Sequence, residues 1–214
     1  SPAGAELGAD QQGRSLNQSA TDTAAFRAWF GDSKVVDENG DPLVVQHNSW
    51  AAGITEFRPS RYGTFGKGAY FSDSGGAAGE YGDQVYRAYL SLQNPWTINV
   101  DPDSSGSVAE DFDSPSVEAV LALPDGRALL EQARDGVGLY GNDLQDTLRE
   151  LGFDGVVATY ADGGVEYVAF DPTQIKSVDN VGTFDANDPR ILNQEGARGQ
   201  INLPENVRTG ESLI

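Results

Sequence analysis

Hydrophobic positions follow a helical spacing in two segments of the chain and a strand-like alternation in several others. The first helix is predicted within residues 21–33, where the apolar side chains that share one face are Phe26, Trp29 and Phe30. The second is predicted over residues 141–152, with a stripe formed by Leu144, Leu148 and Leu151. Each pattern ends at a glycine, as helices commonly do.

Strands are predicted around these helices. Two β-branched runs within residues 34–49 flank an Asn-Gly pair, which indicates a tight hairpin whose second strand ends at His47. A short strand is expected at 68–72, and residues 84–100 alternate between apolar and polar positions.

Near the C-terminus, residues 153–160 and 165–171 predict two strands joined by a turn, and residues 171–178 predict a turn followed by a short edge strand. The order along the chain is therefore strands, then helices, then strands again. Because strands and helices do not alternate regularly, we expect an α+β fold with antiparallel pairing rather than a doubly wound sheet.

The two ends of the chain differ in composition from the middle. Residues 1–18 are small and polar and predict a flexible N-terminal segment, and the periodicity disappears after residue 185. We therefore expect one folded domain over 19–185, with residues 186–214 forming a C-terminal tail or a linker. Since no methionine is present, we also expect a processed chain or a module of a longer protein.

Composition excludes several kinds of chemistry. The sequence has 214 residues, no cysteine and a single histidine, His47, so thiolate nucleophiles, disulfides and multi-histidine metal sites are ruled out. The net charge of −19 opposes non-specific binding to nucleic acids or anionic membranes. It also fits a solvated, self-repelling surface, which needs no functional explanation.

The glycine-rich stretch GTFGKGAYFS, residues 63–72, invites comparison with phosphate-binding loops. Gly63 is followed after only two residues by Gly66 and Lys67, so the spacing differs from the P-loop motif. It also differs from the dinucleotide-binding fingerprint, and it precedes a strand rather than a helix. A flexible turn before an edge strand is the alternative.

Two tyrosines give this stretch another possible role. Tyr70 and Tyr81 belong to one predicted strand–helix unit, where they can sandwich a flat ring. Small residues such as Gly68, Ala77 and Ala78 would let that ring approach the backbone, and a pyridinium ring would gain a cation–π contribution of about 0.5–2 kcal/mol. Ordinary core packing is the alternative for each tyrosine.

Three motifs in order, over roughly residues 22–192, resemble the ADP-ribosyltransferase superfamily. They are His47-Asn48-Ser49, FGKGAYFSDS and EYVAFDPTQIKS. The match is to the branch with a His–Tyr–Glu signature, which includes diphtheria toxin and the poly(ADP-ribose) polymerases. Together with GTFDANDPRI, these phrases are most similar to ADP-ribosyltransferase modules in polyvalent proteins of phages and mobile elements. The resemblance implies two packed, mostly antiparallel sheets, a split β core, with flanking helices.

The resemblance also implies roles for residues in binding NAD⁺, the co-substrate of this superfamily. His47 matches the histidine that hydrogen-bonds the adenosine ribose, and the backbone of Asn48 matches a glycine that holds the nicotinamide carboxamide. Ser49 matches the hydroxyl that supports the same amide. Asparagine replaces the usual glycine here, and it tolerates a positive φ better than most residues, although its side chain could crowd the pocket.

Tyr70 and Tyr81 match the signature tyrosine and the second ring that stacks on nicotinamide, and Glu166 matches the catalytic glutamate. Cleavage of the nicotinamide–ribose bond passes through an oxocarbenium-like state, which a nearby carboxylate stabilises. Glu166 could also orient or deprotonate an acceptor. Without the resemblance, Glu166 would be taken as a solvated strand-end carboxylate.

Four loop residues near these motifs have less specific expectations. Lys67 and Arg61 can contact the NAD⁺ diphosphate or remain solvated, and Phe57 and Phe65 can border the pocket or belong to the core. Gly68 is expected beside the nicotinamide.

The sequence therefore predicts a mono-ADP-ribosyltransferase that acts on a macromolecular acceptor, more readily a protein than a nucleic acid. The alternatives are an NAD⁺ glycohydrolase and a catalytically silent nucleotide-binding module of a larger polyvalent protein. An effector or toxin role, delivered into a host cell by a phage or a secretion system, would suit such a module. Further partners would be neighbouring domains or an immunity or inhibitor protein, and no membrane contact is expected.

Overall fold

A computed structural model describes residues 20–60, 63, 65–73, 81–100, 112–113, 118, 120–124, 126–128, 142–160, 162–180, 182 and 184–192. The predicted N-terminal segment, Ala77, Ala78, Arg61 and the chain beyond Leu192 lie outside these residues. The helices are α2 (Ala24–Phe30), α6 (Asn142–Glu150) and the 3₁₀ turn η2 (Pro172–Gln174). The strands are β1 (Val45–Ser49), β2 (Ala69–Ser72), β3 (Gln84–Leu90), β4 (Trp96–Val100), β5 (Phe112–Asp113), β6 (Gly155–Tyr160), β7 (Val165–Ala169) and β8 (Ile175–Ser177).

All eight strands belong to one sheet in the order β5-β4-β6-β7-β2-β1-β3-β8. Only β4 and β6 run parallel, with α6 in the chain between them, and the other neighbours are antiparallel. The expectation of an α+β fold with mostly antiparallel pairing is therefore confirmed. Two packed sheets are not found, because β2 pairs with both β7 and β1 and so joins the two halves of one sheet.

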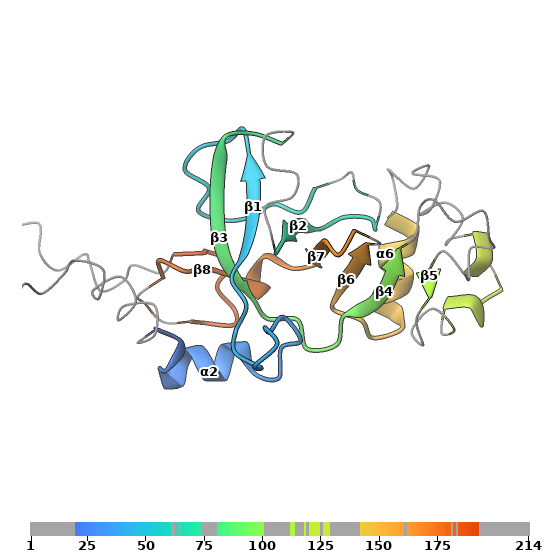
Figure 1. Ribbon diagram of the computed structural model, residues 1–214, viewed down its shortest axis with the longest axis horizontal. Helices are drawn as coiled ribbons and strands as arrows, with labels where there is room; N and C mark the ends of the chain where they lie inside the picture. Colours follow the sequence, from blue (N-terminus) through green and yellow to red (C-terminus); the bar gives the residue numbers. More distant parts are fainter. Residues whose placement is uncertain are drawn as a thin grey trace, which may run out of the picture.

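The two halves of this sheet are joined weakly. β1 pairs with β3 at five positions and β2 with β7 at four, whereas the described residues of β1 and β2 pair only at Gln46↔Ser72. Figure 1 shows the consequence, with β1 and β3 standing side by side and crossing the direction of β2 and β7. The described residues therefore show two neighbouring strands that part within one sheet, and the predicted division into two packed sheets is not confirmed.

Both faces of the sheet are covered. One face packs against α6 through a cluster that includes Trp96, Leu148 and Val168. The opposite face carries a second cluster around Val45 and Phe71. Along β3 the predicted alternation is confirmed, and its two sets of side chains enter different clusters.

The two amphipathic helices form where the spacing predicts them. Thr23 caps α2 by accepting a hydrogen bond from the Phe26 amide, and the buried side chains of the helix are Phe26, Trp29 and Phe30. In α6, Leu144 and Leu148 are buried, but Leu151 is 36% exposed and lies after the last helical residue. The predicted stripe is therefore one residue too long.

Two predicted boundaries are corrected. The hairpin over residues 34–49 is reduced to the single bridge Val36↔Pro42, because the Val35 amide donates to the Ser33 hydroxyl and the Lys34 amide to the Leu92 carbonyl instead of across the hairpin. His47 consequently lies in the middle of β1, which continues to Ser49.

The second correction concerns the C-terminal end of the folded domain, which was predicted at residue 185. Residues 184–192 pack onto the domain, since Ile191 is buried and its amide donates to the Thr55 carbonyl at 2.9 Å. The buried Lys176 ammonium donates to the main-chain carbonyls of Asp188 and Arg190. Two buried apolar side chains, Phe184 and Ile191, and hydrogen bonds to main-chain groups hold this segment, which therefore has no hydrophobic periodicity. The packed chain thus extends past residue 185 to Leu192.

Within the described part of the chain, no helix has the length and apolar character needed to cross a membrane.

Candidate functional site

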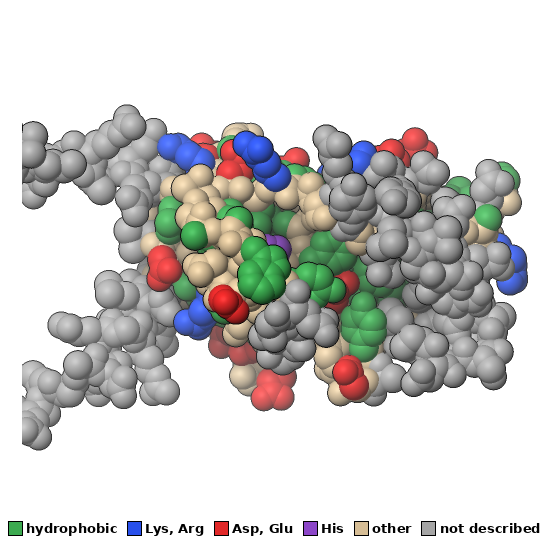
Figure 2. Space-filling view, turned by 90° about the horizontal axis from the view of Figure 1, so that it is seen from above, with side chains coloured by type: hydrophobic (Ala, Val, Ile, Leu, Met, Phe, Trp, Pro, Cys, Tyr) green, Lys and Arg blue, Asp and Glu red, His purple; other side chains and the backbone are tan. Residues whose placement is uncertain are grey.

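A cavity of about 570 Å³ lies where β1 and β2 part. Seven of the predicted site residues line it, namely His47, Asn48, Ser49, Gly68, Tyr70, Tyr81 and Glu166. Figure 2 shows the histidine inside a hollow of the surface, bordered by hydrophobic side chains. The fold therefore gathers residues that are far apart in the sequence around one space, while their roles remain predictions.

The edge of β1 opens into this cavity. Beyond Gln46, the described residues of β2 do not pair with β1, although β1 continues through His47, Asn48 and Ser49. Main-chain groups on an unpaired strand edge need hydrogen-bond partners, and a ligand can supply them. The Ser49 hydroxyl accepts a hydrogen bond from the Ala51 amide at 3.1 Å, which holds the turn after the strand.

Asn48 occupies its position without backbone strain. Every positive φ in the described chain belongs to a glycine, so Asn48 has the ordinary extended conformation of β1, where it pairs with Val85. The tolerance of asparagine for a positive φ is therefore not needed here. Asn48 lines the cavity, and the role of its backbone in holding a carboxamide stays a prediction.

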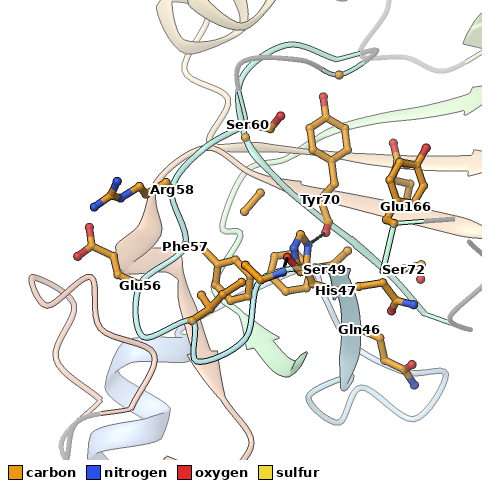
Figure 3. A pocket seen from close by; sticks show the side chains of 18 residues that line it. Gln46, His47, Ser49, Glu56, Phe57, Arg58, Ser60, Tyr70, Ser72 and Glu166 are labelled. Atoms are coloured by element: carbon orange, nitrogen blue, oxygen red, sulfur yellow. Dashed lines mark hydrogen bonds between the residues drawn. The ribbon is translucent and has the colours of Figure 1, made fainter. Parts of the chain in front are cut away.

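His47 is held by the main chain of the neighbouring strand. Its Nδ1 lies 2.7 Å from the Tyr70 carbonyl oxygen, and because a carbonyl can only accept, Nδ1–H donates (Figure 3). Burial lowers the pKa of His47, although this hydrogen bond opposes the shift. The neutral ring therefore presents Nε2 as a hydrogen-bond acceptor. Phe57 packs edge-on at 4.9 Å between ring centres and keeps the imidazole in place.

Tyr70 explains part of the glycine-rich stretch. Its hydroxyl donates to the Gly66 carbonyl at 2.7 Å and accepts from the Phe65 amide at 3.2 Å. A Cβ added at residue 63 would lie 2.0 Å from this hydroxyl oxygen, so Gly63 is required by the tyrosine itself. A Cβ at residue 68 would lie 2.4 Å from the Val168 side chain. These two glycines thus serve packing within the protein, in addition to any room they leave for a ligand.

The other tyrosine of the predicted sandwich is open to solvent. Tyr81 lines the cavity and is 62% exposed. Tyr70, in contrast, is partly buried, and burial together with the Glu166 carboxylate raises the pKa of its hydroxyl. The two rings therefore have different freedom to move, and Tyr81 is the one that can adjust to a ligand.

Glu166 lies in the middle of the sheet, paired with Ser72 of β2 and Ala158 of β6. Burial raises the pKa of Glu166 to about 7, and a hydrogen bond from the Tyr160 hydroxyl opposes the increase. A carboxyl group with a pKa this far above its usual range is typical of functional sites, although structural groups can show the same shift.

Tyr160 was not predicted from the sequence. It stands two residues after Ala158 on β6, so it points to the same sheet face as Glu166 and is its diagonal neighbour. The sequence could have placed Tyr160 beside Glu166 only through the pairing register of the β6–β7 hairpin. The turn at 161–164 does not fix that register to within one residue. A one-residue change would have moved Tyr160 to the other face.

The charged wall of the cavity also differs from the prediction. Arg58 is the one cation among the described lining residues, and Figure 3 shows it beside Glu56, on the opposite side of His47 from Glu166. Lys67 does not line the cavity, and its carbonyl accepts from the Gln145 side chain at 2.5 Å. The sequence offered no signal to distinguish Arg58 from other loop cations.

Phe57 and Phe65, the two loop phenylalanines, lie in different parts of the protein. Phe57 is 3% exposed, lines the cavity and belongs to the cluster around Val45. Phe65 is fully buried in the cluster beneath α6. The described residues contain no group of three or more histidine, aspartate or glutamate side chains that could hold a metal ion.

Comparisons with known proteins give one extended match. The family model described as ADP-Ribosyltransferase in polyvalent proteins matches residues 37–184. No curated protein sequence matches the chain. A solved structure described as "Crystal structure of an anti-CRISPR protein" is similar with 21% identity and a TM-score of 0.35, and the match covers 59% of this chain and 88% of that one. A TM-score this low supports no conclusion about fold or function.

Proposed function

Because the chain belongs to the family of ADP-ribosyltransferases found in polyvalent proteins, we propose that it cleaves NAD⁺ and transfers one ADP-ribose to a macromolecular acceptor. The observation that carries the proposal is the position of Glu166. Its carboxyl group lies in the same cavity as an imidazole acceptor, an unpaired strand edge and an exposed tyrosine ring. These groups suit a dinucleotide that carries a cationic nicotinamide ring, a ribose and a carboxamide.

The residues around the cavity fit NAD⁺ in distinct ways. The neutral His47 can accept a hydrogen bond from a ribose hydroxyl through Nε2, because Nδ1 is already engaged with Tyr70. The free edge of β1 at Asn48 offers main-chain donors and acceptors to the carboxamide. Tyr81 can stack on the nicotinamide ring, and Arg58 is the cation available for the diphosphate.

Glu166 would act on the ribose. Burial raises the pKa of this carboxyl group to about 7 and so keeps a large share of it protonated near neutral pH. The positive charge of bound nicotinamide favours the ionised form, so binding itself would prepare the carboxylate. The carboxylate then stabilises the positive charge that develops on the ribose as the bond to nicotinamide breaks. Nicotinamide leaves as a neutral molecule and needs no general acid.

The test uses NAD⁺ labelled in the adenylate part, a cell lysate as the source of acceptors, and the Glu166→Gln variant. We expect the wild type to release nicotinamide and label a macromolecule, and the variant to lose at least about a hundredfold in turnover. Glu150→Gln, an exposed glutamate on α6, is the matched control and should retain activity.

The products separate the alternatives. Free ADP-ribose without labelled macromolecules would support an NAD⁺ glycohydrolase in place of a transferase. If the wild type and Glu166→Gln both bind NAD⁺ but release no nicotinamide, the chain is a silent nucleotide-binding module, and the proposal of an enzyme fails. A toxin or effector role would follow only from transfer to a host macromolecule.

A further inference from the structure

Exposed hydrophobic side chains are concentrated at the mouth of the cavity. The described chain has four large hydrophobic residues with more than a third of their surface exposed: Trp50 at 72%, Tyr81 at 62%, Val85 at 52% and Leu151 at 36%. Tyr81 lines the cavity, Trp50 stands between two residues that line it, and Val85 is the β3 partner of the lining residue Asn48. We name Trp50, Tyr81 and Val85 the mouth patch. Single exposed apolar residues need no explanation, but a cluster beside a site indicates an interaction surface.

The backbone holds these three residues together. Trp50 stands between Ser49 and Ala51, which both line the cavity, and Val85 pairs with Asn48 across β1 and β3. The chain next to Tyr81 lies against the start of this turn, since a Cβ at residue 82 would be 2.3 Å from the Trp50 amide nitrogen. The patch is therefore part of the folded β1–β3 end, and it adjoins the cavity through Tyr81 and the turn at Trp50.

Charge indicates the chemistry of the partner. The whole chain carries a net charge of −19, and Asp83 is exposed between Tyr81 and Val85. Arg87 is the next cation along β3, two residues further from the mouth than Val85. A phosphate backbone approaching this surface is repelled by the overall charge, whereas a basic polypeptide is attracted.

We propose that the mouth patch docks a basic polypeptide acceptor, with an arginine side chain of that acceptor stacked on the exposed Trp50 indole. The proposal rests on the proposed function and adds the class of acceptor to it. A guanidinium group stacks on an aromatic face through cation–π attraction while its stem contacts apolar neighbours such as Val85. Asp83 supplies a carboxylate for a second basic residue of the same segment.

Docking at this place puts the acceptor beside the breaking bond. A nucleophilic atom of the acceptor forms a bond to the anomeric carbon of the ribose as the bond from that carbon to nicotinamide breaks. Nicotinamide keeps the bonding electron pair and leaves neutral. The proton lost by the acceptor passes to Glu166 or to water, so the net products are ADP-ribosylated acceptor, nicotinamide and one proton.

The experiment uses three fluorescent probes: an arginine-rich peptide, the same peptide with citrulline in place of arginine, and a single-stranded oligonucleotide. Each is tested for binding by fluorescence anisotropy and for transfer of labelled ADP-ribose. Trp50→Ala is compared with Leu151→Ala, which removes an exposed hydrophobic side chain away from the patch. Nicotinamide release without any acceptor is measured in parallel.

We expect the wild type to bind and modify the arginine peptide at least about tenfold better than the citrulline peptide. Trp50→Ala should raise the KM for the peptide about tenfold and leave nicotinamide release without acceptor unchanged, whereas Leu151→Ala should match the wild type. Equal peptide use by Trp50→Ala and the wild type would overturn the proposal, as would preferential labelling of the oligonucleotide.

The failure of this inference differs from the failure of the proposed function. If the wild type releases no nicotinamide under any condition, the proposed function fails, and docking is then judged by peptide anisotropy alone. Binding of the arginine peptide that Trp50→Ala weakens would still support the patch as a docking surface. Turnover of NAD⁺ with no preference for the arginine peptide would keep the function and refute the docking.

Discussion

The two sides of the cavity hold their titratable groups in different ways. His47, on the β1 side, donates Nδ1–H to a main-chain carbonyl of β2, so its position depends on the backbone. Glu166, on the β7 side, accepts a hydrogen bond from the Tyr160 hydroxyl, so its protonation state depends on another side chain. Burial favours the neutral form of both groups, lowering the pKa of the first and raising that of the second to about 7.

The signs of these shifts make the two sides respond oppositely to pH. The unfolded state binds more protons than folded His47 as the pH falls below about 6.5, so this group destabilises the fold in acid. Glu166 binds its proton more tightly when folded, so its stabilising contribution is present below about pH 4.5 and is lost as the pH rises through about 7. Burial therefore favours the neutral form of both side chains at mildly acidic pH.

The largest effect is expected from breaking the support of the β1 side. Lys176 is fully buried and donates to two carbonyls of the segment that pairs with Thr55 and Glu56 beside the cavity. Lys176→Met leaves those carbonyls without their donor and should lower the free energy of unfolding by about 3 kcal/mol. Thermal and urea unfolding measure it, with the exposed Lys34→Met as control. Equal stability of the two variants would show that this anchor is unimportant.

The next effect concerns the β7 side. Glu166→Gln removes the group whose ionisation is opposed by burial, so the variant should be more stable than the wild type by on the order of 2 kcal/mol above pH 7. The advantage should shrink as the pH falls and disappear near pH 4.5. Unfolding curves between pH 4 and 9 test this, and a stability difference that does not change with pH would contradict a raised pKa of Glu166.

A matched pair of substitutions separates the two nitrogen atoms of His47. Asparagine places its amide nitrogen near the position of Nδ1 and keeps the hydrogen bond to Tyr70, whereas glutamine places it near Nε2. We expect His47→Asn to remain within about 1 kcal/mol of the wild type in stability but to raise the KM for NAD⁺ about tenfold. His47→Gln should lose about 1 kcal/mol of stability. If His47→Gln were the more stable of the two variants, the hydrogen bond from Nδ1 to Tyr70 would not be the contact that stabilises the fold.

The smallest effect sharpens the role of Tyr160. Tyr160→Phe removes the hydroxyl that lowers the pKa of Glu166, so this pKa should rise further above about 7. The acid limb of the pH–rate profile for nicotinamide release should move up by about half to one pH unit, with rates recovering at pH 9. Tyr167→Phe, on the opposite face of β7, should leave the profile unchanged. The same shift in both variants would refute a specific contact.

The sequence predicted those elements in which local pattern and packing agree. The helix at Phe26, the hairpin that carries Glu166 and the edge strand at Ile175 all follow from periodicity and turn residues. The gathering of His47, Tyr70 and Glu166 around one cavity followed from the resemblance. No local pattern places those residues together, since they occupy three strands whose order in the sheet is set by tertiary pairing.

The remaining features depended on long-range contacts. Whether Arg58 or Lys67 faces the cavity is decided by how the loop packs, because Lys67 is held through its carbonyl by Gln145 of α6. Tyr160 could be assigned to Glu166 only once the hairpin register was known. The segment at 184–192 packs through Phe184 and Ile191, and two buried residues that enter different clusters form no periodic pattern.

The central pairing of β2 with β7 has a consequence for how the molecule folds. Tyr70 and Glu166 lie on adjacent strands but are separated by about a hundred residues of chain, and β3 and β8 are similarly distant. We expect such non-local pairings to form late, because the entropy cost of closing a long loop precedes the stabilising contacts. The local hairpin of β6 and β7 can form early, but it lacks the residues of β1 and β2 that line the cavity together with Glu166. We therefore expect the cavity to form at the end of folding.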